Sequence, residues 1–359
     1  MTNEARTQAT ERTSDLSDWT NEVLDQLLPE KQSRVELKSV SGDASFRRYF
    51  RAECGQRSFI AVDAPIASED SQTFVRIADL FRAAGVCTPE VISTNFEQGF
   101  MLLDDFGDNL YLADLLKFQQ QNAADATDKL YGAAIRSLLS IQQHVDSSLL
   151  DPFDREKLLQ EMALFEQWFC LGLLNLELAE SDQMLIEDTV SLLAQAAVSQ
   201  TQVAVHRDYH SRNLMLLDSS RFGAESGPGI IDFQDAVAGA YTYDLVSLLR
   251  DCYIRWQPQQ VNHWALLYFS QAKSAGIIGN LTEDEFLRDF DLMGLQRNLK
   301  VMGIFARLNI RDHKPQFLAD IPLVIRNFLE VSEKYPDLAN FRSWFTDTVL
   351  PVAREKLEL

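Results

Sequence analysis

Over the first hundred or so residues, apolar and polar positions alternate in short stretches that turn residues separate, a pattern typical of β-strands. Residues 35–65, with the sequence VELKSVSGDASFRRYFRAECGQRSFIAVDAP, predict three strands separated by a loop at 41–45 and a turn at Gly55-Gln56. Residues 69–84 have helical spacing and stop at Gly85. Two more strands are predicted in TPEVIST and GFMLLDD. The pattern therefore predicts a small sheet with one helix.

From the stretch DDFGDN onward, the apolar positions follow a helical period, and clear strand signals are confined to VAVH, LMLL and GIID. We expect an α+β protein of two lobes, a small β-rich N-terminal lobe at 21–107 and a larger, mainly helical C-terminal lobe at 108–359. Residues 1–20 are polar and are predicted to form a disordered tail. The expected helices of the larger lobe lie near 110–119, 124–146, 154–176, 182–199, 242–252, 259–274, 283–309 and 317–332.

The charge of the chain narrows the class of partner. Of the 359 residues 46% are hydrophobic, which is enough for a sizeable core, and the formal net charge is −20. Such a surface repels phosphate backbones and anionic lipids, so we expect neither nucleic acid nor a membrane as partner. A site for an anionic ligand must then carry its own cations or a metal ion. The oligomeric state is left open.

The cysteines and the N-terminal sequence point to the cytoplasm. The four cysteines are far apart and form no CxxC pair, which fits a reducing compartment better than a disulfide framework or a zinc site. The N-terminal residues lack the apolar core of a signal peptide. No stretch is long and apolar enough to span a bilayer. We therefore expect a cytoplasmic protein.

A group of polar residues stands out in VHRDYHSRNLMLLD, residues 205–218. His206-Arg207-Asp208, followed after four residues by Asn213, matches the protein-kinase catalytic-loop pattern H-R-D-x-x-x-x-N at every fixed position. In that chemistry the Asp orients and deprotonates the attacking hydroxyl group, and the Asn binds a magnesium ion. Downstream, GIIDFQD places Asp232 where kinases have a second magnesium ligand, and Gln234 where they have a glycine.

Each of these residues also has a purely structural interpretation. A histidine beside a strand is often a buried structural residue, and we expect His206 to hold the loop. Asp208, Asn213 or Asp232 alone could end a strand or form a turn. A zinc site at His206-x-Asp208-x-His210 is a rival interpretation, but no third cluster of ligands supports it, and oxygen ligands favour magnesium. Taken together with three flanking apolar strands, the set favours catalysis.

On these motifs, the sequence resembles the aminoglycoside phosphotransferase/choline kinase family, which has a protein-kinase-like fold. The likeness covers about residues 35–330. More narrowly, SGDASFRRYFR, VDAPI, GFMLLDDFGD, IDFQDAVAGAYTYDLVSLLRDCY and QRNLKVMGIFARLNIRD are similar to bacterial anomeric amino-sugar kinases. Those enzymes phosphorylate N-acetylmuramate and N-acetylglucosamine at the C1 hydroxyl during peptidoglycan recycling.

The resemblance implies roles for particular residues, with ATP and Mg²⁺ as cofactors. Asp208 would be the catalytic base, and Asn213 and Asp232 would bind magnesium. The nucleotide would be bound by the phosphate-covering loop and by the strand that joins the lobes. The residues expected there are Ser41, Gly42 and Ser45 in the loop, and Leu103, Asp104 and Asp105 in the strand and hinge.

One position departs from the kinase pattern. Protein kinases carry a lysine on the third strand for the α- and β-phosphates, but SFIAVDAP has no lysine at the corresponding position. The nearby cations are Arg47, Arg48 and Arg51 of the second strand, and we expect one of them to replace the lysine, in the first place Arg48, which stands among apolar even positions. The alternative is that these arginines form a solvated face. The missing lysine also leaves open a nucleotide-binding pseudokinase.

A basic stripe is predicted on the apolar helix DLMGLQRNLKVMGIFARLNIR. At 100° per residue, Lys300, Arg307 and Arg311 fall on one narrow face. A basic stripe on a buried helix needs carboxylate partners or a cleft. One interpretation is a set of structural ion pairs. The other is that Lys300 or Arg307 binds an anionic group of the acceptor, such as the lactyl carboxylate of N-acetylmuramate.

Three further polar residues are candidates for the site. Arg212 would neutralise phosphate charge or pair with Asp208, and Asp235 would accept hydrogen bonds from sugar hydroxyls or assist the metal. Asp244 is expected to be a structural partner of the catalytic loop. The predicted function is an ATP- and magnesium-dependent sugar kinase. The alternatives are an aminoglycoside, choline or homoserine-type kinase, or the pseudokinase.

Overall fold

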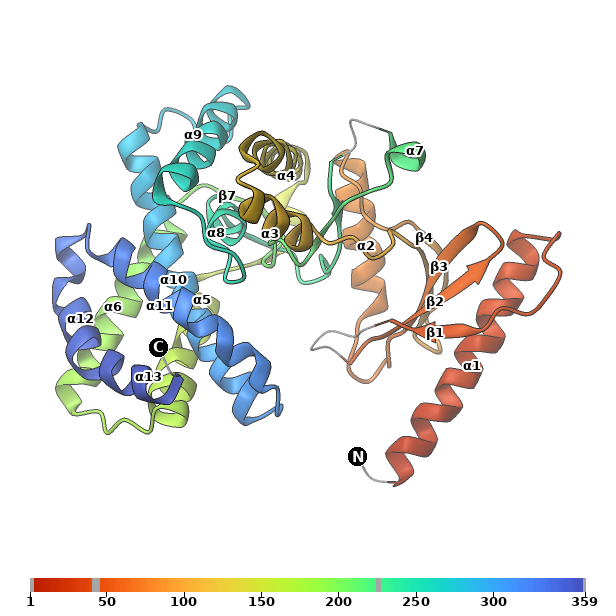
Figure 1. Cartoon of the computed structure of the whole chain (residues 1–359), viewed down its shortest axis with the longest axis horizontal. Coiled ribbons are helices and arrows are strands. Elements are labelled where there is room, and N and C mark those ends of the chain that lie inside the picture. The colour runs from red at the N-terminus through yellow and green to blue at the C-terminus, as the bar shows by residue number, and fades with distance from the viewer. Residues whose placement is uncertain (1–2, 41–45, 224–226, 358–359) are drawn as a thin grey trace. The chain divides into compact units, whose positions relative to one another are not determined.

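The computed structural model describes residues 3–40, 46–223 and 227–357 (Figure 1). The chain divides into two compact units. The N-terminal unit comprises Met1–Asn109 together with Met215–Gln234, and the C-terminal unit comprises Leu110–Leu214 and Asp235–Leu359. The segment that carries Asp232 thus belongs to the N-terminal unit, although it follows 105 residues of the other unit and was expected in the C-terminal lobe.

A five-stranded antiparallel sheet forms the centre of the N-terminal unit, in the order β1-β2-β3-β5-β4. Its strands match those predicted from the alternation of apolar residues, and Gly55, at φ +63°, makes the turn between β2 and β3. Arg48 and Asp63 face each other in the register of these two strands. The strands are β1 (Leu37–Ser39), β2 (Arg48–Cys54), β3 (Arg57–Asp63), β4 (Val91–Asn95) and β5 (Phe100–Asp104).

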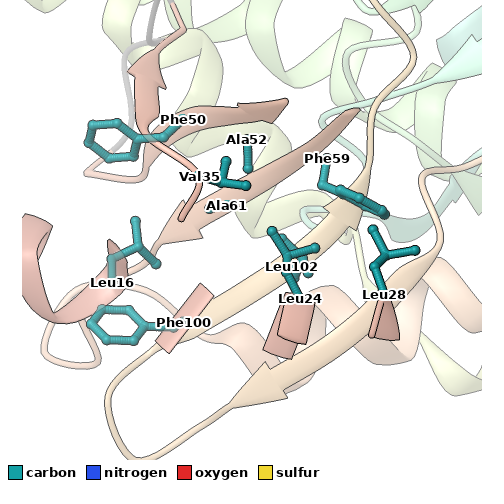
Figure 2. Packing of buried hydrophobic residues seen from close by; sticks show 10 residues of the cluster. All are labelled: Leu16, Leu24, Leu28, Val35, Phe50, Ala52, Phe59, Ala61, Phe100 and Leu102. Atoms are coloured by element: carbon teal, nitrogen blue, oxygen red, sulfur yellow. The ribbon is translucent and has the colours of Figure 1, made fainter. Parts of the chain in front are cut away.

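The polar N-terminal segment is helical rather than a disordered tail. Helix α1 spans Asn3–Leu27 and packs along the sheet. Its few apolar residues recur at helical spacing, so Leu16 and Leu24 are both fully buried. Figure 2 shows them with side chains of β2, β3 and β5. The buried cluster comprises Leu16, Leu24, Leu28, Val35, Phe50, Ala52, Phe59, Ala61, Phe100 and Leu102.

Helix α2 (Ser71–Ala83) completes this unit together with the returning segment. Asp70 caps α2 by accepting hydrogen bonds from the backbone N–H groups of Gln72 and Thr73, each at 3.0 Å. The returning segment contains α7 (Ser219–Phe222) and β9 (Gly229–Ile230), and the N–H of Ile230 donates to the carbonyl of Cys87 at 2.7 Å. Residues more than a hundred positions apart therefore close one unit.

The C-terminal unit is mainly helical, as predicted, with a three-stranded sheet in the order β6-β10-β7. No helix of the described ranges has the length and apolar character needed to cross a membrane. The chain returns to the N-terminal unit within β8 (Leu214–Met215). The elements of the C-terminal unit are α3 (Tyr111–Gln121), α4 (Ala124–His144), η1 (Ser147–Leu149), β6 (Asp151–Pro152), α5 (Arg155–Leu164), η2 (Phe165–Leu173), α6 (Glu180–Val198), β7 (Gln202–Val205), β10 (Val237–Ala240), α8 (Tyr243–Leu249), α9 (Pro258–Ser274), α10 (Glu283–Ile310), η3 (Pro315–Asp320), α11 (Ile321–Ser332), η4 (Pro336–Leu338), α12 (Ala339–Trp344), η5 (Phe345–Val349) and α13 (Leu350–Leu357).

Helix α10 is the central element of the C-terminal unit. It begins at a capping box, in which Thr282 and Glu285 hydrogen-bond each other's backbone N–H, and residues 291–300 are all buried. Gly303 lets α5 approach closely, because a Cβ at that position would lie 2.6 Å from the carbonyl oxygen of Leu164. This contact sets the spacing between α5 and α10, from which two charged residues of the candidate site project.

Candidate active site

The loop after β7 brings Asp208 and Asn213 together. β7 pairs with β10, with Val205 opposite Val237, so the loop starts at an anchored strand end. The side-chain amide of Asn213 donates to the carbonyl oxygen of Asp208 at 3.0 Å. The N–H of His210 donates to the same carbonyl at 3.0 Å. The motif recognised from its spacing is therefore one compact, hydrogen-bonded loop.

Asp244, at the start of α8, holds the backbone of this loop through two hydrogen bonds. Its carboxylate accepts hydrogen bonds from the backbone N–H groups of His206 at 2.6 Å and Arg207 at 3.0 Å. This confirms the expected structural role of Asp244. Arg207 has a φ of +80°, a strained conformation for a non-glycine residue, which these bonds help to maintain. Burial raises the pKa of Asp244 to about 7, although both backbone donors favour its charged form.

His206 itself is fully buried and its ring lies edge-on to that of Tyr209 at 5.7 Å. The backbone N–H of Asp208 donates to Nδ1 of His206 at 3.3 Å. The residue therefore supports the loop, as its interpretation as a structural histidine predicted.

Positive charges surround the carboxylate of Asp208, which is half-buried. Burial alone would raise its pKa, but the attraction of nearby basic side chains outweighs burial and holds the pKa of Asp208 below its usual range. These side chains are Lys300, His210, Arg297 and Arg207. Asp208 is consequently ionised over the whole neutral range.

Glu161 of α5 organises two of these cations, and the sequence analysis missed it. Its carboxylate accepts a hydrogen bond from Arg207 at 2.6 Å and lies 2.9 Å from Nζ of Lys300. Burial raises the pKa of Glu161, but Lys300 and Arg207 outweigh burial and lower it. No spacing in REKLLQEMAL distinguishes this glutamate from its neighbours, so only the packing of α5 on α10 reveals it.

Lys300 and Arg307, predicted as alternatives, differ in their surroundings. Lys300 is buried, paired with Glu161, and donates to the hydroxyl of Tyr243 at 2.8 Å. Arg307 is half-buried, and its Nε has no hydrogen-bond partner among the described residues. Burial and the charge of Arg311 both lower the pKa of Arg307. Arg311 pairs with Asp312. The structure thus separates a paired cation from one that could accept an anionic ligand.

Asp232 belongs to the N-terminal unit and has a left-handed backbone, with φ +62°. Gln234, at the position of the kinase glycine, donates from its side-chain amide to Oδ1 of Asp232 at 2.8 Å. Phe233 packs on Phe74 of α2, with ring centroids 4.8 Å apart. The local conformation of Asp232 is therefore fixed by its two following residues.

The oxygen ligands of Asn213 and Asp232 suit magnesium, which prefers hard oxygen donors. Among residues 3–40, 46–223 and 227–357, no group of three or more His, Cys, Asp or Glu side chains could hold a metal ion. Asn213 lies in the C-terminal unit and Asp232 in the N-terminal unit, and each offers a hard oxygen ligand of the kind that magnesium takes.

Arginines engage the side chains of the hinge residues. Asp104 pairs with Arg221, which also donates to the carbonyl of Asp105 at 2.9 Å. The carboxylate of Asp105 accepts a hydrogen bond from Arg51 at 2.6 Å, and Leu103 is buried at the end of β5. The hinge sequence is therefore held in shape by two guanidinium groups that its motif does not predict.

Three of the remaining predicted residues have local surroundings of their own. Arg48 hydrogen-bonds Asp63 at 3.0 Å, Arg212 lies over the ring of Tyr253 at 3.6 Å, and Asp235 is exposed. In the described chain Arg212 makes no ion pair with Asp208. The predicted loop residues Ser41, Gly42 and Ser45 lie outside the described residues.

Comparison with known proteins adds an independent line of evidence. The chain is 39% identical over 305 residues to N-acetylmuramate/N-acetylglucosamine kinase of Pseudomonas aeruginosa, covering 85% of this chain and 86% of that protein. It is 37% identical to the protein of the same name from Neisseria meningitidis, covering 90% and 92%.

Among solved structures, choline kinase LicA from Streptococcus pneumoniae matches with a TM-score of 0.58 at 11% identity, covering 88% of this chain and 99% of that one. ADP-bound aminoglycoside phosphotransferase APH(2'')-Ib matches with a TM-score of 0.53 at 15% identity, covering 86% and 98%. These two likenesses show a shared fold. The model of the phosphotransferase enzyme family matches residues 36–276, and the chain belongs to this family.

Proposed function

We propose that this protein transfers the γ-phosphoryl group of ATP to the C1 hydroxyl of N-acetylmuramate and N-acetylglucosamine, with Mg²⁺ as cofactor. The names of the relatives at 37–39% identity support the two sugars. The observation that carries the proposal is Asp208, a carboxylate kept ionised by surrounding cations on a loop that also holds Asn213.

In this mechanism Asp208 positions the sugar hydroxyl and receives its proton. The sugar oxygen forms a bond to the γ-phosphorus while the bond from that phosphorus to the β-phosphate oxygen breaks, and ADP leaves. A carboxylate of low pKa is a weak base, so it suits an anomeric hydroxyl, which is more acidic than an ordinary alcohol. Orientation and charge neutralisation supply most of the catalysis in phosphoryl transfer.

Asn213 and Asp232 are proposed to hold Mg²⁺, which would neutralise charge on the phosphates. The role of this chain in that site is to present two oxygen ligands with fixed orientation. The hydrogen bond from Asn213 to the Asp208 carbonyl orients the first, and the bond from Gln234 orients the second. Leu103, Asp104 and Asp105 are proposed to line the site of the adenine base.

Arg307 is the better candidate of the basic stripe for binding the lactyl carboxylate of N-acetylmuramate. Lys300 already has a carboxylate partner in Glu161. Among the described residues Arg307 makes no such close pair, although the charge of Asp312 acts on it, and its Nε has no hydrogen-bond partner. Seven residues of helix separate them by about 10 Å.

The proposal is tested by measuring ADP release with Mg-ATP across N-acetylmuramate, N-acetylglucosamine, glucose, kanamycin, choline and homoserine. We expect turnover on the two N-acetylated sugars and an acid-labile phosphate product, with activity lost in Asp208→Asn. Turnover on another acceptor alone would refute the proposed substrate. Nucleotide binding without turnover on any acceptor would favour the pseudokinase.

A further inference from the structure

One face of the N-terminal sheet packs against α1, and Arg48 lies on that face. The buried cluster under α1 includes Phe50 and Ala52 of β2 and Phe59 and Ala61 of β3. Because side chains alternate along a strand, Arg48 must lie on this same face. Its partner Asp63 also accepts a hydrogen bond at 3.1 Å from Arg12 of α1. Arg48 therefore serves the junction with α1.

Three other basic residues of this unit have carboxylate partners away from α2. Arg51 donates to Asp105 and Asp108 near the end of β5, and Arg221 pairs with Asp104. Lys38 at β1 pairs with Glu53 on the hairpin surface. None of these pairs of the described chain involves residues next to Asp232.

Arg47 is placed differently from its neighbour. Its side chain is only 6% exposed, and Nη2 lies 2.8 Å from Oε2 of Glu69, two residues before α2 begins. The other carboxylate oxygen of Glu69 accepts a hydrogen bond from the backbone N–H of Phe46 at 3.1 Å. One half-buried glutamate thus fixes both the side chain of Arg47 and the backbone that leads into β2.

Aromatic contacts connect Arg47 to the segment that carries Asp232. The guanidinium carbon of Arg47 lies 5.8 Å from the ring centroid of Phe74 in α2. Phe74 in turn packs on Phe233 at 4.8 Å, and Phe233 directly follows Asp232. The whole path lies within one unit, so Phe74 of α2 links Arg47 to the segment that carries the proposed magnesium ligand.

We propose that Arg47, held by Glu69, binds the phosphates of ATP and replaces the lysine that the third strand lacks. A guanidinium group has five N–H donors, so one edge can remain on Glu69 while another meets phosphate oxygens. A charge-assisted bond to phosphate in a dry site is strong enough to matter for affinity. The inference rests on the proposed function only in taking ATP as the ligand.

The test is direct binding of ATP and of adenosine to the full-length protein in the presence of Mg²⁺ and without acceptor. We expect Arg47→Ala to weaken ATP binding by about 10- to 100-fold, the effect of one lost charge-assisted contact, and to change adenosine binding by less than about twofold. Arg57→Ala, an exposed arginine of the same sheet, is the matched control and should change neither affinity.

A second variant guards against a folding defect. Arg47→Gln keeps a hydrogen-bond donor but no charge, and should show the same selective loss for ATP while the protein stays folded at the assay temperature, as followed by circular dichroism. Equal losses for ATP and adenosine would overturn the proposal, as would a selective loss in Arg48→Ala instead of the Arg47 variants.

The acceptor is absent from this assay, so the two proposals fail separately. A wild-type protein that binds ATP, but phosphorylates no amino sugar, refutes the proposed acceptor while the Arg47 comparison still decides the phosphate contact. A wild-type protein that binds no ATP refutes both.

Discussion

Replacing Gly303 by alanine tests the contact that sets the distance between α5 and α10. The added Cβ would lie 2.6 Å from both the carbonyl oxygen and the Cβ of Leu164, so the two helices must separate. Alanine gains about 1 kcal/mol over glycine inside a helix. Overpacking against a helix backbone costs about 1–3 kcal/mol, or more when the backbone cannot yield. Because the clash is with the backbone of Leu164, the cost lies at the upper end of that range, and we expect a net loss of stability of about 2 kcal/mol.

The same change should disturb the candidate site. Glu161 reaches Lys300 at 2.9 Å because α5 lies against α10, and a shift of a few tenths of an ångström lengthens that contact. We therefore expect a fall in kcat together with the loss of stability. Gly132→Ala is the control, because Gly132 is also helical and buried, but its added Cβ would meet only Nη1 of Arg136 at 3.5 Å.

The measurement is urea unfolding followed by tryptophan fluorescence. This signal reports mainly on the C-terminal unit, since four of the five tryptophans belong to it. Gly132→Ala should be more stable than the wild type by about 0.5–1 kcal/mol. If Gly303→Ala were stabilised to the same degree, the close approach of α5 to α10 would be wrong. The tryptophans are Trp19 in the N-terminal unit and Trp168, Trp256, Trp264 and Trp344 in the C-terminal unit.

Three further predictions concern charge. Lys300→Met should move the acid limb of the kcat–pH profile to higher pH, because the charge of Lys300 lowers the pKa of Asp208; an unmoved limb would contradict this. The unfolding free energy of the wild type, measured relative to Asp244→Asn by urea unfolding, should decrease as pH rises from about 4 to about 7. The reason is that the folded protein retains on Asp244 a proton that the unfolded chain has lost. A difference between the two proteins that stays constant with pH would refute this prediction. Arg307→Ala should reduce kcat/KM for N-acetylmuramate about 10-fold more than for N-acetylglucosamine, and equal losses would count against a lactyl contact.

The helical periods and the catalytic-loop motif were readable because each is local. Helix α10 was expected at 283–309 and spans Glu283–Ile310, since its apolar residues cover most of its circumference. The spacing of Asp208 and Asn213 is set by a single loop, so their proximity follows from neighbouring residues alone.

The features that were missed depend on residues distant in the chain. The burial of Leu16 and Leu24 required knowing that a sheet would cover α1, whose composition is polar. Glu161 acquires its role only from packing against Lys300. The choice between Arg47 and Arg48 depends on strand register, because a shift of one residue moves a side chain to the other face of a sheet.

The discontinuous N-terminal unit has a consequence for synthesis on the ribosome. Phe233 and β9 belong to its interior, yet they follow Asn109 by about 120 residues. At about 5–20 residues per second, the first strands would wait roughly 6–25 s for the segment that completes them. During that interval the nascent chain exposes Phe74 and Phe81 of α2, which Phe233 later covers. Slowing translation between codons 110 and 215 should therefore increase aggregation of this protein more than slowing it after codon 240.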